Sequence, residues 1–263
     1  MKKMNVLHDY LCSRMIVEGK KLESQEYGQI YYKTNEDLVD AYLDTDFRDK
    51  DVFSVLSSSD QVLTARYLDA KTVDAFDRNR LTPYYFYLRL WALKYNNELY
   101  PEIMNRGAHK WMSELLKKVK PESEEEKKAL LFFQKHQQLY SNYSKLFFDE
   151  IGNMNAATLF QKAKDLEDCL STELEFRCVD FFQTFEVEKD YDIVLMSNIP
   201  DLAKEKELRA IAENLRRLTR KNGTIICSNL IYQTPEKRKL QEEIFSPYFE
   251  REDKPYSYVY HRK

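Results

Sequence analysis

The chain has 263 residues, enough for one large domain, and its hydrophobic share of 43% supports an ordinary buried core. A net charge of −3 excludes the basic footprint of a duplex-binding protein, so no nucleic-acid partner is expected. No apolar run reaches the roughly 18 residues of a membrane span, and the first residues lack the apolar core of a secretory signal, which predicts a cytoplasmic protein.

Cysteine and histidine are scattered along the chain. The four cysteines form no CxxC pair and stand at Cys12, Cys169, Cys178 and Cys227. This spacing argues against a zinc site and against a disulfide scaffold, so no metal is predicted.

The chain opens with a mostly helical pattern. We predict an N-terminal helical segment at residues 1–45, interrupted near Gly28, and a main domain at 46–263.

The main domain begins with the most informative pattern in the chain. An apolar run at 51–56 breaks into Ser57, Ser58, Ser59 and Asp60, a helical segment follows at 62–68, and a second apolar run ends on Asp77. Strand, tight turn, helix, strand and terminal carboxylate form the first βαβ unit of nucleotide-binding α/β sheets. The pattern therefore predicts a ligand that contains a ribose.

A helical stretch follows this unit. Residues 81–94 predict a helix that is apolar on most faces, and residues 97–170 predict a helical insertion without a convincing strand. The abundant tyrosines are interpreted as packing residues, and they are Tyr31, Tyr32, Tyr84, Tyr85 and Tyr87.

Strand patterns resume after the insertion. Strands are predicted at 174–180, 191–197, 224–232 and 256–260, with a helix near 235–245. Another helix carries Leu208, Ile211, Leu215 and Leu218 on one stripe and is expected to close at Asn222 and Gly223. Alternating strands and helices predict an α/β fold with a doubly wound, mostly parallel sheet, with an antiparallel edge at its end.

Ligands of such sheets bind at the carboxyl ends of strands. Asp77 at the end of the second strand can accept hydrogen bonds from both ribose hydroxyls, although an acid there can also cap the next helix. Asp180 at the end of the third strand can receive an adenine amino group, or can be a turn acid. Asn198 ends the fourth strand and can donate and accept, and Asp201 is a candidate base or substrate orienter, or a helix cap.

The serine turn has two interpretations. Ser59 or Asp60 can cap the following helix, or the turn can present backbone N–H groups to a ligand's polar tail. The turn contains no glycine, which disfavours close approach of a pyrophosphate and therefore disfavours NAD, FAD and ATP. S-adenosylmethionine has no phosphate and carries an amino-acid tail that a serine turn could hold.

Three segments together resemble S-adenosylmethionine-dependent transferases of the Rossmann methyltransferase class. They are Leu56–Asp60, Phe76–Asn79 and Ser197–Asp201. More narrowly, they resemble the diacylglycerol 3-amino-3-carboxypropyltransferase family of betaine-lipid synthesis, whose Tyr…Trp-Glu-Asp segment is similar to residues 30–37. The resemblance implies that Asp77, Arg78 and Asn79 bind the cofactor, that the serine turn holds its methionine moiety, and that Asn198 and Asp201 lie near the transferred group.

The leading hypothesis is an S-adenosylmethionine-dependent transferase that moves a methyl or a 3-amino-3-carboxypropyl group to a small-molecule acceptor, which is a lipid in the family it resembles. The alternative is a non-catalytic Rossmann-like protein that uses its helical insertion for protein interaction.

Overall fold

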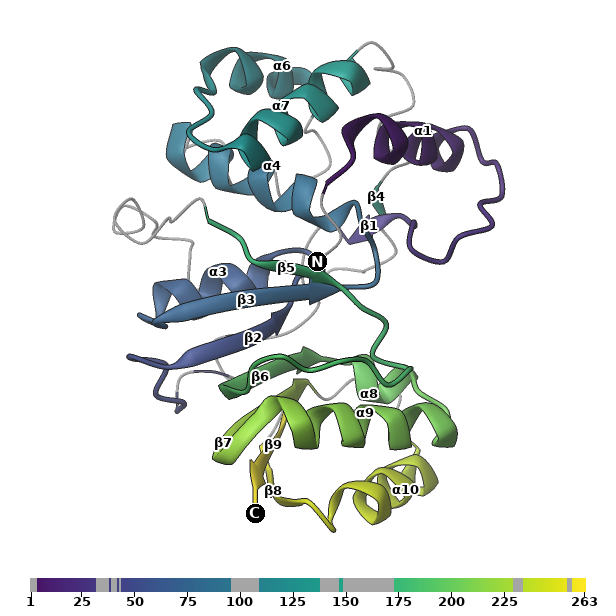
Figure 1. Cartoon of the computed structure of the whole chain (residues 1–263), viewed down its shortest axis with the longest axis vertical. Coiled ribbons are helices and arrows are strands. Elements are labelled where there is room, and N and C mark those ends of the chain that lie inside the picture. Colours follow the sequence, from purple (N-terminus) through teal and green to yellow (C-terminus); the bar gives the residue numbers. More distant parts are fainter. Residues whose placement is uncertain are drawn as a thin grey trace.

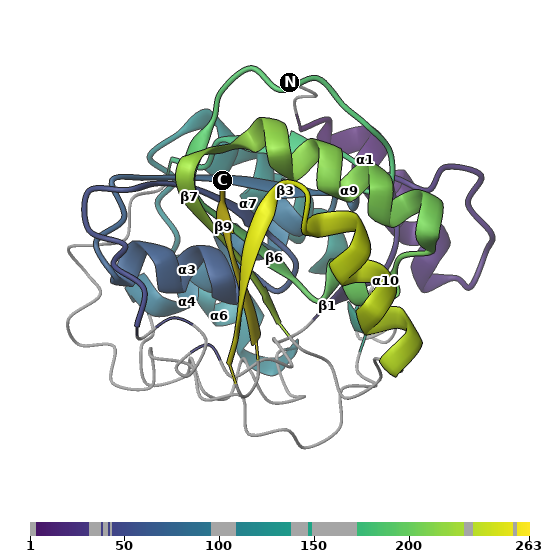
Figure 2. The same ribbon diagram turned by 90° about the horizontal axis from the view of Figure 1, so that it is seen from below.

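A seven-stranded sheet with helices on both faces forms the centre of the molecule (Figures 1 and 2). The computed structural model describes residues 4–31, 38, 42, 44–95, 109–137, 147–148, 173–228, 234–254 and 257–263. The predicted α/β fold with a doubly wound, mostly parallel sheet is confirmed.

The strands run in the order β5-β3-β2-β6-β7-β9-β8 across the sheet. The first five of these are parallel, and β9 is antiparallel to both β7 and β8. Their bounds are Asp51–Val55 (β2), Thr72–Asp77 (β3), Phe176–Cys178 (β5), Tyr191–Ser197 (β6), Thr219–Ser228 (β7), Phe249–Asp253 (β8) and Ser257–Arg262 (β9). Strand β8 was not predicted, because four consecutive charged residues, 250–253, leave it without an apolar pattern.

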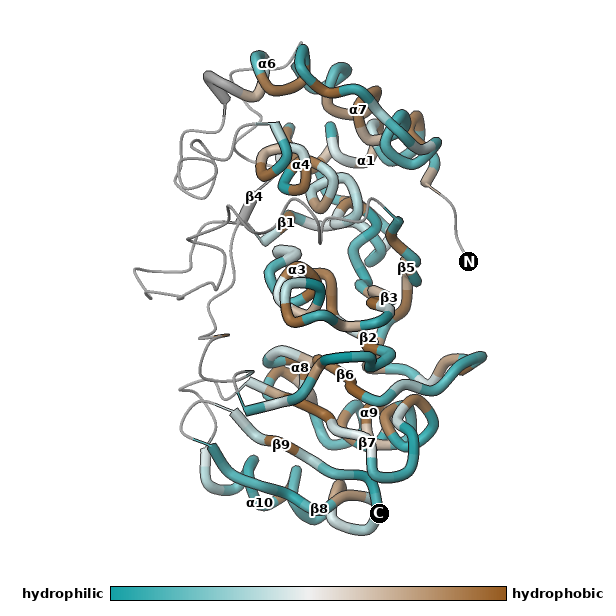
Figure 3. Tube along the Cα trace, turned by 90° about the vertical axis from the view of Figure 1, so that its left-hand side faces the viewer, coloured by the Kyte–Doolittle hydropathy of each residue, from teal (hydrophilic) through white to brown (hydrophobic). Residues whose placement is uncertain are grey.

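Both faces of the sheet are buried. Neighbouring residues Val52 and Phe53 of β2 belong to two different hydrophobic clusters, since successive side chains of a strand point to opposite faces. Ile193 and Val194 of β6 divide in the same way. This double burial explains why neither β2 nor β6 shows an exposed polar face. Brown apolar residues lie in both strands in Figure 3.

Helices α3 (Asp60–Tyr67) and α4 (Thr82–Tyr95) lie on one side of the sheet, and α9 (Glu205–Leu218) and α10 (Pro235–Phe245) lie on the other (Figure 2). The short helix α8 (Ile199–Leu202) follows β6. The predicted stripe of α9 is confirmed, because its four apolar residues are all buried. In the described part of the chain, no helix is long and apolar enough to cross a membrane.

A second helical layer covers α4 (Figure 1). It contains α1 (Val6–Val17), α6 (His109–Lys118) and α7 (Glu124–Gln137), the last two from the region predicted as an insertion. The described residues between α1 and Ile30 form no helix, and β1 (Ile30–Tyr31) pairs in parallel with β4 (Phe147–Phe148). Burial of Tyr84, Tyr85 and Tyr87 in α4 confirms their packing role, whereas Tyr32 lies outside the described residues.

The expected helix end at Asn222 and Gly223 is wrong. Helix α9 ends at Leu218, and both residues lie inside β7. Asn222 has a left-handed backbone (φ 63°), and a Cβ on Gly223 would lie 2.8 Å from the Thr219 side chain and 3.0 Å from the Asp192 carbonyl oxygen. Close approach of two strands therefore explains this glycine.

A buried histidine of α7, His136, contacts α1 and is expected to make the free energy of unfolding depend on pH. His136 Nε2 lies 2.7 Å from Ser13 Oγ, and burial lowers the pKa of His136 from 6.5 to about 4. The unfolded chain binds this proton at higher pH than the folded chain, so the free energy of unfolding should fall by about 3 kcal/mol between pH 6.5 and 4. Urea denaturation should show a shallower pH slope for His136→Gln, and an unchanged slope for the exposed control His8→Gln. Equal slopes for wild type and His136→Gln would contradict this.

Candidate functional site

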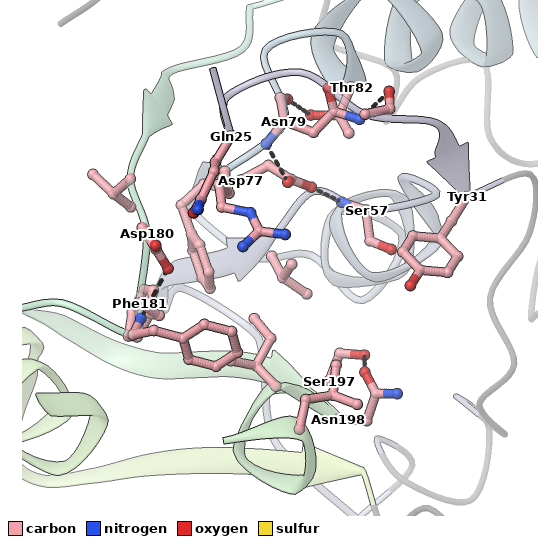
Figure 4. A pocket seen from close by; sticks show the side chains of 18 of the residues that line it. Gln25, Tyr31, Ser57, Asp77, Asn79, Thr82, Asp180, Phe181, Ser197 and Asn198 are labelled. Carbon is pink, nitrogen blue, oxygen red and sulfur yellow. Dashed lines mark hydrogen bonds between the residues drawn. The ribbon is translucent and has the colours of Figure 1, made fainter. Parts of the chain in front are cut away.

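The topological switch point of the sheet lies between β2 and β6. From β2 the chain winds outward through β3 to β5, and from β6 it winds the other way to β7. In open α/β sheets ligands bind beyond the carboxyl ends of the strands at such a point. A cavity of about 370 Å³ lies there (Figure 4), within the range of roughly 300–1,000 Å³ that is usual for small-molecule sites.

Six of the ten predicted site residues line this cavity: Ser57, Asp77, Arg78, Asn79, Asp180 and Asn198. Four do not, and they are Ser58, Ser59, Asp60 and Asp201. The structure thus brings six of the predicted residues together at one cavity, and the contacts of each residue decide what it can do there.

Asp77 lies at the centre of the cavity wall (Figure 4). Its Oδ2 accepts the backbone N–H of Ser57 at 2.9 Å, and its Oδ1 accepts that of Asn79 at 2.8 Å. Burial raises the pKa of Asp77 to about 6, although both N–H donors act in the opposite direction. The carboxylate is fixed in orientation, and each oxygen keeps a second lone pair for a ligand hydroxyl.

The serine turn has a backbone that glycine normally supplies. Ser57 and Ser59 have positive φ values of 41° and 74°, in or near the left-handed region. The turn therefore keeps a glycine-like shape without glycine. Two of its N–H groups are engaged within the chain, since Ser57 donates to Asp77 and Ser59 donates to the Leu56 carbonyl at 2.5 Å.

Asp60 is a structural residue and is not exposed to the cavity. Its carboxylate pairs with Arg89 of α4 at 2.5 Å, with both side chains fully buried. Ser58 Oγ donates to Asp60 at 2.7 Å, and the Arg89 guanidinium also donates to the Ser58 carbonyl oxygen. Ser59 occupies the N-cap position of α3 without a side-chain cap hydrogen bond. The side chains of Ser58, Ser59 and Asp60 are thus buried behind the turn and do not line the cavity.

Ser59 combines a left-handed backbone with a buried hydroxyl, so glycine at this position is expected to stabilise the turn. Ser59 Oγ has no hydrogen-bond partner among the described residues. Ser59→Gly should raise the free energy of unfolding by about 1 kcal/mol, because relief of left-handed strain and of the unpaired hydroxyl outweighs the entropy of glycine. Urea denaturation measures this. Ser58→Gly is the matched control and should destabilise, because Ser58 lacks a positive φ and donates to Asp60. Destabilisation by Ser59→Gly would contradict this account.

Asn79 holds the chain that covers the cavity. Its Nδ2 donates to the carbonyl oxygens of Gly28 at 3.0 Å and Gln29 at 3.1 Å, and its Oδ1 accepts the N–H of Leu81 at 3.1 Å. These bonds occupy the amide, so Asn79 lines the cavity as a positioning residue.

The end of β6 is irregular where it meets the cavity. The β6–β7 register shifts between Leu195 and Ser197, and Ser197 has a left-handed backbone (φ 54°). Such irregularities re-aim side chains next to functional sites. Here Asn198 lines the cavity, and its Oδ1 accepts from Ser197 Oγ at 3.2 Å. Asp201 lies one helical turn further on, outside the lining, where its carbonyl oxygen accepts from Lys237.

Asp180 and two phenylalanines form the other end of the cavity (Figure 4). The Asp180 carboxylate accepts the N–H of Phe182 at 3.0 Å and the side chain of Gln183 at 3.4 Å. The turn-acid interpretation is thus correct locally, and the same carboxylate still lines the cavity. Phe181 and Phe182 supply apolar surface beside it.

Sequence reasoning missed the segment that covers the cavity. This segment, residues 25–31, is called the strap below, and it contributes Gln25, Tyr27, Gly28, Gln29 and Tyr31. It has no recognisable motif apart from the interruption near Gly28. Tyr31 is 44% exposed and lies beside Ser57 (Figure 4), so its interpretation as a packing residue is wrong. Residues 32–37 of the family-like segment lie outside the described residues.

The cavity carries more acid than base. Its charged lining residues are Asp77, Arg78 and Asp180, and its aromatic residues include Tyr27 and Tyr31. Two carboxylates and aromatic faces suit a ligand with a positive charge. No group of three metal-ligating side chains occurs among the residues that the structure describes.

No protein-family model and no curated protein sequence matches the chain. Among solved structures it is similar to the N-methyltransferase NodS of Bradyrhizobium japonicum in complex with S-adenosyl-L-homocysteine (8% identity, 81% of this chain and 78% of that chain covered, TM-score 0.35). It is also similar to a ribosomal protein L11 methylase of Lactobacillus delbrueckii subsp. bulgaricus (9% identity, 97% of this chain and 79% of that chain covered, TM-score 0.36). A third similar structure is magnesium protoporphyrin IX methyltransferase of Synechocystis PCC 6803 with bound S-adenosylmethionine (13% identity, 100% of this chain and 86% of that chain covered, TM-score 0.36).

The chain itself has five parallel strands followed by an antiparallel end.

Proposed function

We propose that the chain is an S-adenosylmethionine-dependent transferase, with the cofactor in the cavity at the β2–β6 switch point. The observation that carries this proposal is the fixed carboxylate of Asp77 at the end of β3, inside a cavity that also contains Asp180 and Asn198. A carboxylate that accepts both hydroxyls of a ribose makes strong, charge-assisted hydrogen bonds.

The chemistry of the cavity residues fits the cofactor along its length. Asp77 holds the ribose, and Asp180 with Phe181 receives the adenine, where the carboxylate accepts the amino group. The serine turn and Tyr31 lie toward the opposite end, which is left for the amino-acid tail and the sulfonium (Figure 4). The aromatic face of Tyr31 at that end favours the positive charge of the sulfonium.

Asn198 is the residue that orients the acceptor. It extends from the irregular end of β6 and can both donate and accept a hydrogen bond. Bound S-adenosylmethionine supplies a carbon activated by the sulfonium, whose thioether leaving group needs no acid. The protein therefore contributes mainly by positioning the acceptor in line with the carbon–sulfur bond. Asp201 is not retained as the base, because it lies outside the cavity lining.

Isothermal titration with S-adenosylhomocysteine tests binding, with NADH as the matched control ligand. We expect saturable heat for the first ligand and none for the second. Absence of heat at millimolar S-adenosylhomocysteine would overturn the proposal and leave the non-catalytic alternative.

The products of turnover separate the two transfer reactions. Methyl transfer leaves S-adenosylhomocysteine, whereas 3-amino-3-carboxypropyl transfer leaves 5′-methylthioadenosine. S-adenosylhomocysteine among the products, detected by mass spectrometry of reactions with candidate small-molecule acceptors, would indicate methyl transfer. Accumulation of 5′-methylthioadenosine would instead favour the reaction of the betaine-lipid family.

A further inference from the structure

One buried carboxylate outside the cavity connects the first helix to the strap. Asp9 of α1 is 1% exposed. Its Oδ1 accepts the hydroxyl of Tyr27 at 2.7 Å, and its Oδ2 accepts the hydroxyl of Tyr84 at 2.7 Å and the backbone N–H of Asn5 at 2.9 Å. Asp9 thus binds one tyrosine of the strap and one tyrosine of α4 at the same time.

Asp9 also lies next to the loop that carries the ribose carboxylate. Arg80, three residues after Asp77, approaches Asp9 Oδ1 with its Nε at 3.5 Å. The backbone N–H of Arg80 donates to the Glu26 carbonyl oxygen at 2.9 Å. The Asn79 side-chain amide donates to the carbonyl oxygens of Gly28 and Gln29, which also belong to the strap. The strap and the 77–80 loop are therefore joined by several hydrogen bonds and share one buried anion.

The strap is a wall of the cavity rather than a distant segment. Its residues Gln25, Tyr27 and Gln29 line the cavity beside Asp77 and also line a second cavity of about 810 Å³, whose lining shares Arg78 with the first. Within the strap, Tyr27 and Ile30 are buried in the hydrophobic core, whereas Gly28 and Gln29 between them are not. Hydrogen bonds join the middle of the strap, residues 26–29, to Asp9 of α1 and to Asn79 and Arg80 of the 77–80 loop.

We infer that Asp9 is a positioning residue for the cofactor site, which fixes the strap over the ligand through Tyr27 and Arg80 without touching the ligand. This inference rests on the proposed function for its ligand. Removing Asp9 leaves Tyr27 without its acceptor and Arg80 without its nearest buried anion. The strap then loses its fixed position, and ligand affinity falls while the sheet and Asp77 stay intact.

The test compares Asp9→Ala with Glu126→Ala, another buried carboxylate of the helical layer. Glu126 is 2% exposed and accepts Trp91 Nε1 at 3.0 Å, but it binds no strap residue in the described structure. S-adenosylhomocysteine should bind Asp9→Ala at least about tenfold more weakly than wild type, as expected for losing hydrogen bonds to a charged group. Its affinity for Glu126→Ala should stay unchanged. Equal affinities for wild type and a folded Asp9→Ala would overturn the inference.

A second pair of variants keeps the test decisive if Asp9→Ala does not fold. Tyr27→Phe and Tyr84→Phe each remove one hydroxyl from the same carboxylate, and only Tyr27 lines the cavity. Weaker binding by Tyr27→Phe alone supports the inference, and equal effects of the two variants overturn it.

Amide hydrogen exchange of residues 25–31 provides a readout that needs no ligand. Exchange should accelerate in Tyr27→Phe and, where it folds, in Asp9→Ala, and not in Glu126→Ala. Unchanged exchange would overturn the inference. If wild type binds no S-adenosylhomocysteine, the proposed function fails, while hydrogen exchange still decides the role of Asp9.

Discussion

Arg89→Leu is expected to lower the free energy of unfolding by about 3–5 kcal/mol, because it leaves the Asp60 carboxylate fully buried without its cation. The loss should exceed that of an ordinary surface substitution, since no solvent reaches either side chain. Urea denaturation at neutral pH measures the change. The same variant should also weaken S-adenosylhomocysteine binding, because Arg89 supports the carbonyl oxygen of Ser58 in the turn.

The double variant Arg89→Leu, Asp60→Ala is the control for this prediction. It removes the Asp60 carboxylate together with the Arg89 guanidinium, so no unpaired charge stays buried. The double variant should therefore be less destabilised than Arg89→Leu alone. A free energy of unfolding for Arg89→Leu within about 1 kcal/mol of the wild-type value would contradict a buried ion pair, whose disruption costs several kcal/mol.

Asp77→Ala should weaken S-adenosylhomocysteine binding by at least about a hundredfold, since two charge-assisted hydrogen bonds contribute roughly 1.5–3 kcal/mol each. Isothermal titration measures the affinity. Asp74→Ala is the matched control on the same strand, because Asp74 accepts the Tyr191 hydroxyl at 2.7 Å and does not line the cavity. Unchanged affinity in a folded Asp77→Ala variant would show that Asp77 is only a turn residue.

The raised pKa of Asp77 adds a pH dependence to this prediction. Below about pH 6 the carboxyl is protonated, so wild-type affinity should fall as the pH drops from 7 to 5. Asp77→Asn has no such group and should bind weakly with little change over this range. The free energy of unfolding depends on pH in the opposite direction. Because the raised pKa favours the protonated form of Asp77 in the folded chain, its contribution to stability is lost as the pH rises through about 6.

The sequence predicted what depends on local spacing. Strand β2, the turn, α3 and β3 follow one another within 27 residues (Asp51–Asp77), and parallel strands bring their carboxyl ends to one edge of the sheet. Asp77, Asp180 and Asn198 could therefore be placed at one cavity without knowledge of any tertiary contact.

The roles of the turn residues could not be predicted, because they depend on partners far along the chain. Asp60 is an attractive ligand contact until Arg89, 29 residues later, is found against it. The strap was missed for the same reason, since Asn79 and Gly28 are 51 residues apart. The shape of the turn could not be predicted from its composition either, because Ser57 and Ser59 occupy positive-φ positions that glycine usually fills.

The most direct test of the central claim is a crystal structure of the chain with S-adenosylhomocysteine. We expect the ligand in the cavity at the switch point, with both ribose hydroxyl oxygens about 2.5–3.0 Å from the Asp77 carboxylate oxygens. Asp180 should face the adenine, and the sulfur should lie toward Asn198. Ligand bound elsewhere, or a ribose away from Asp77, would contradict the account.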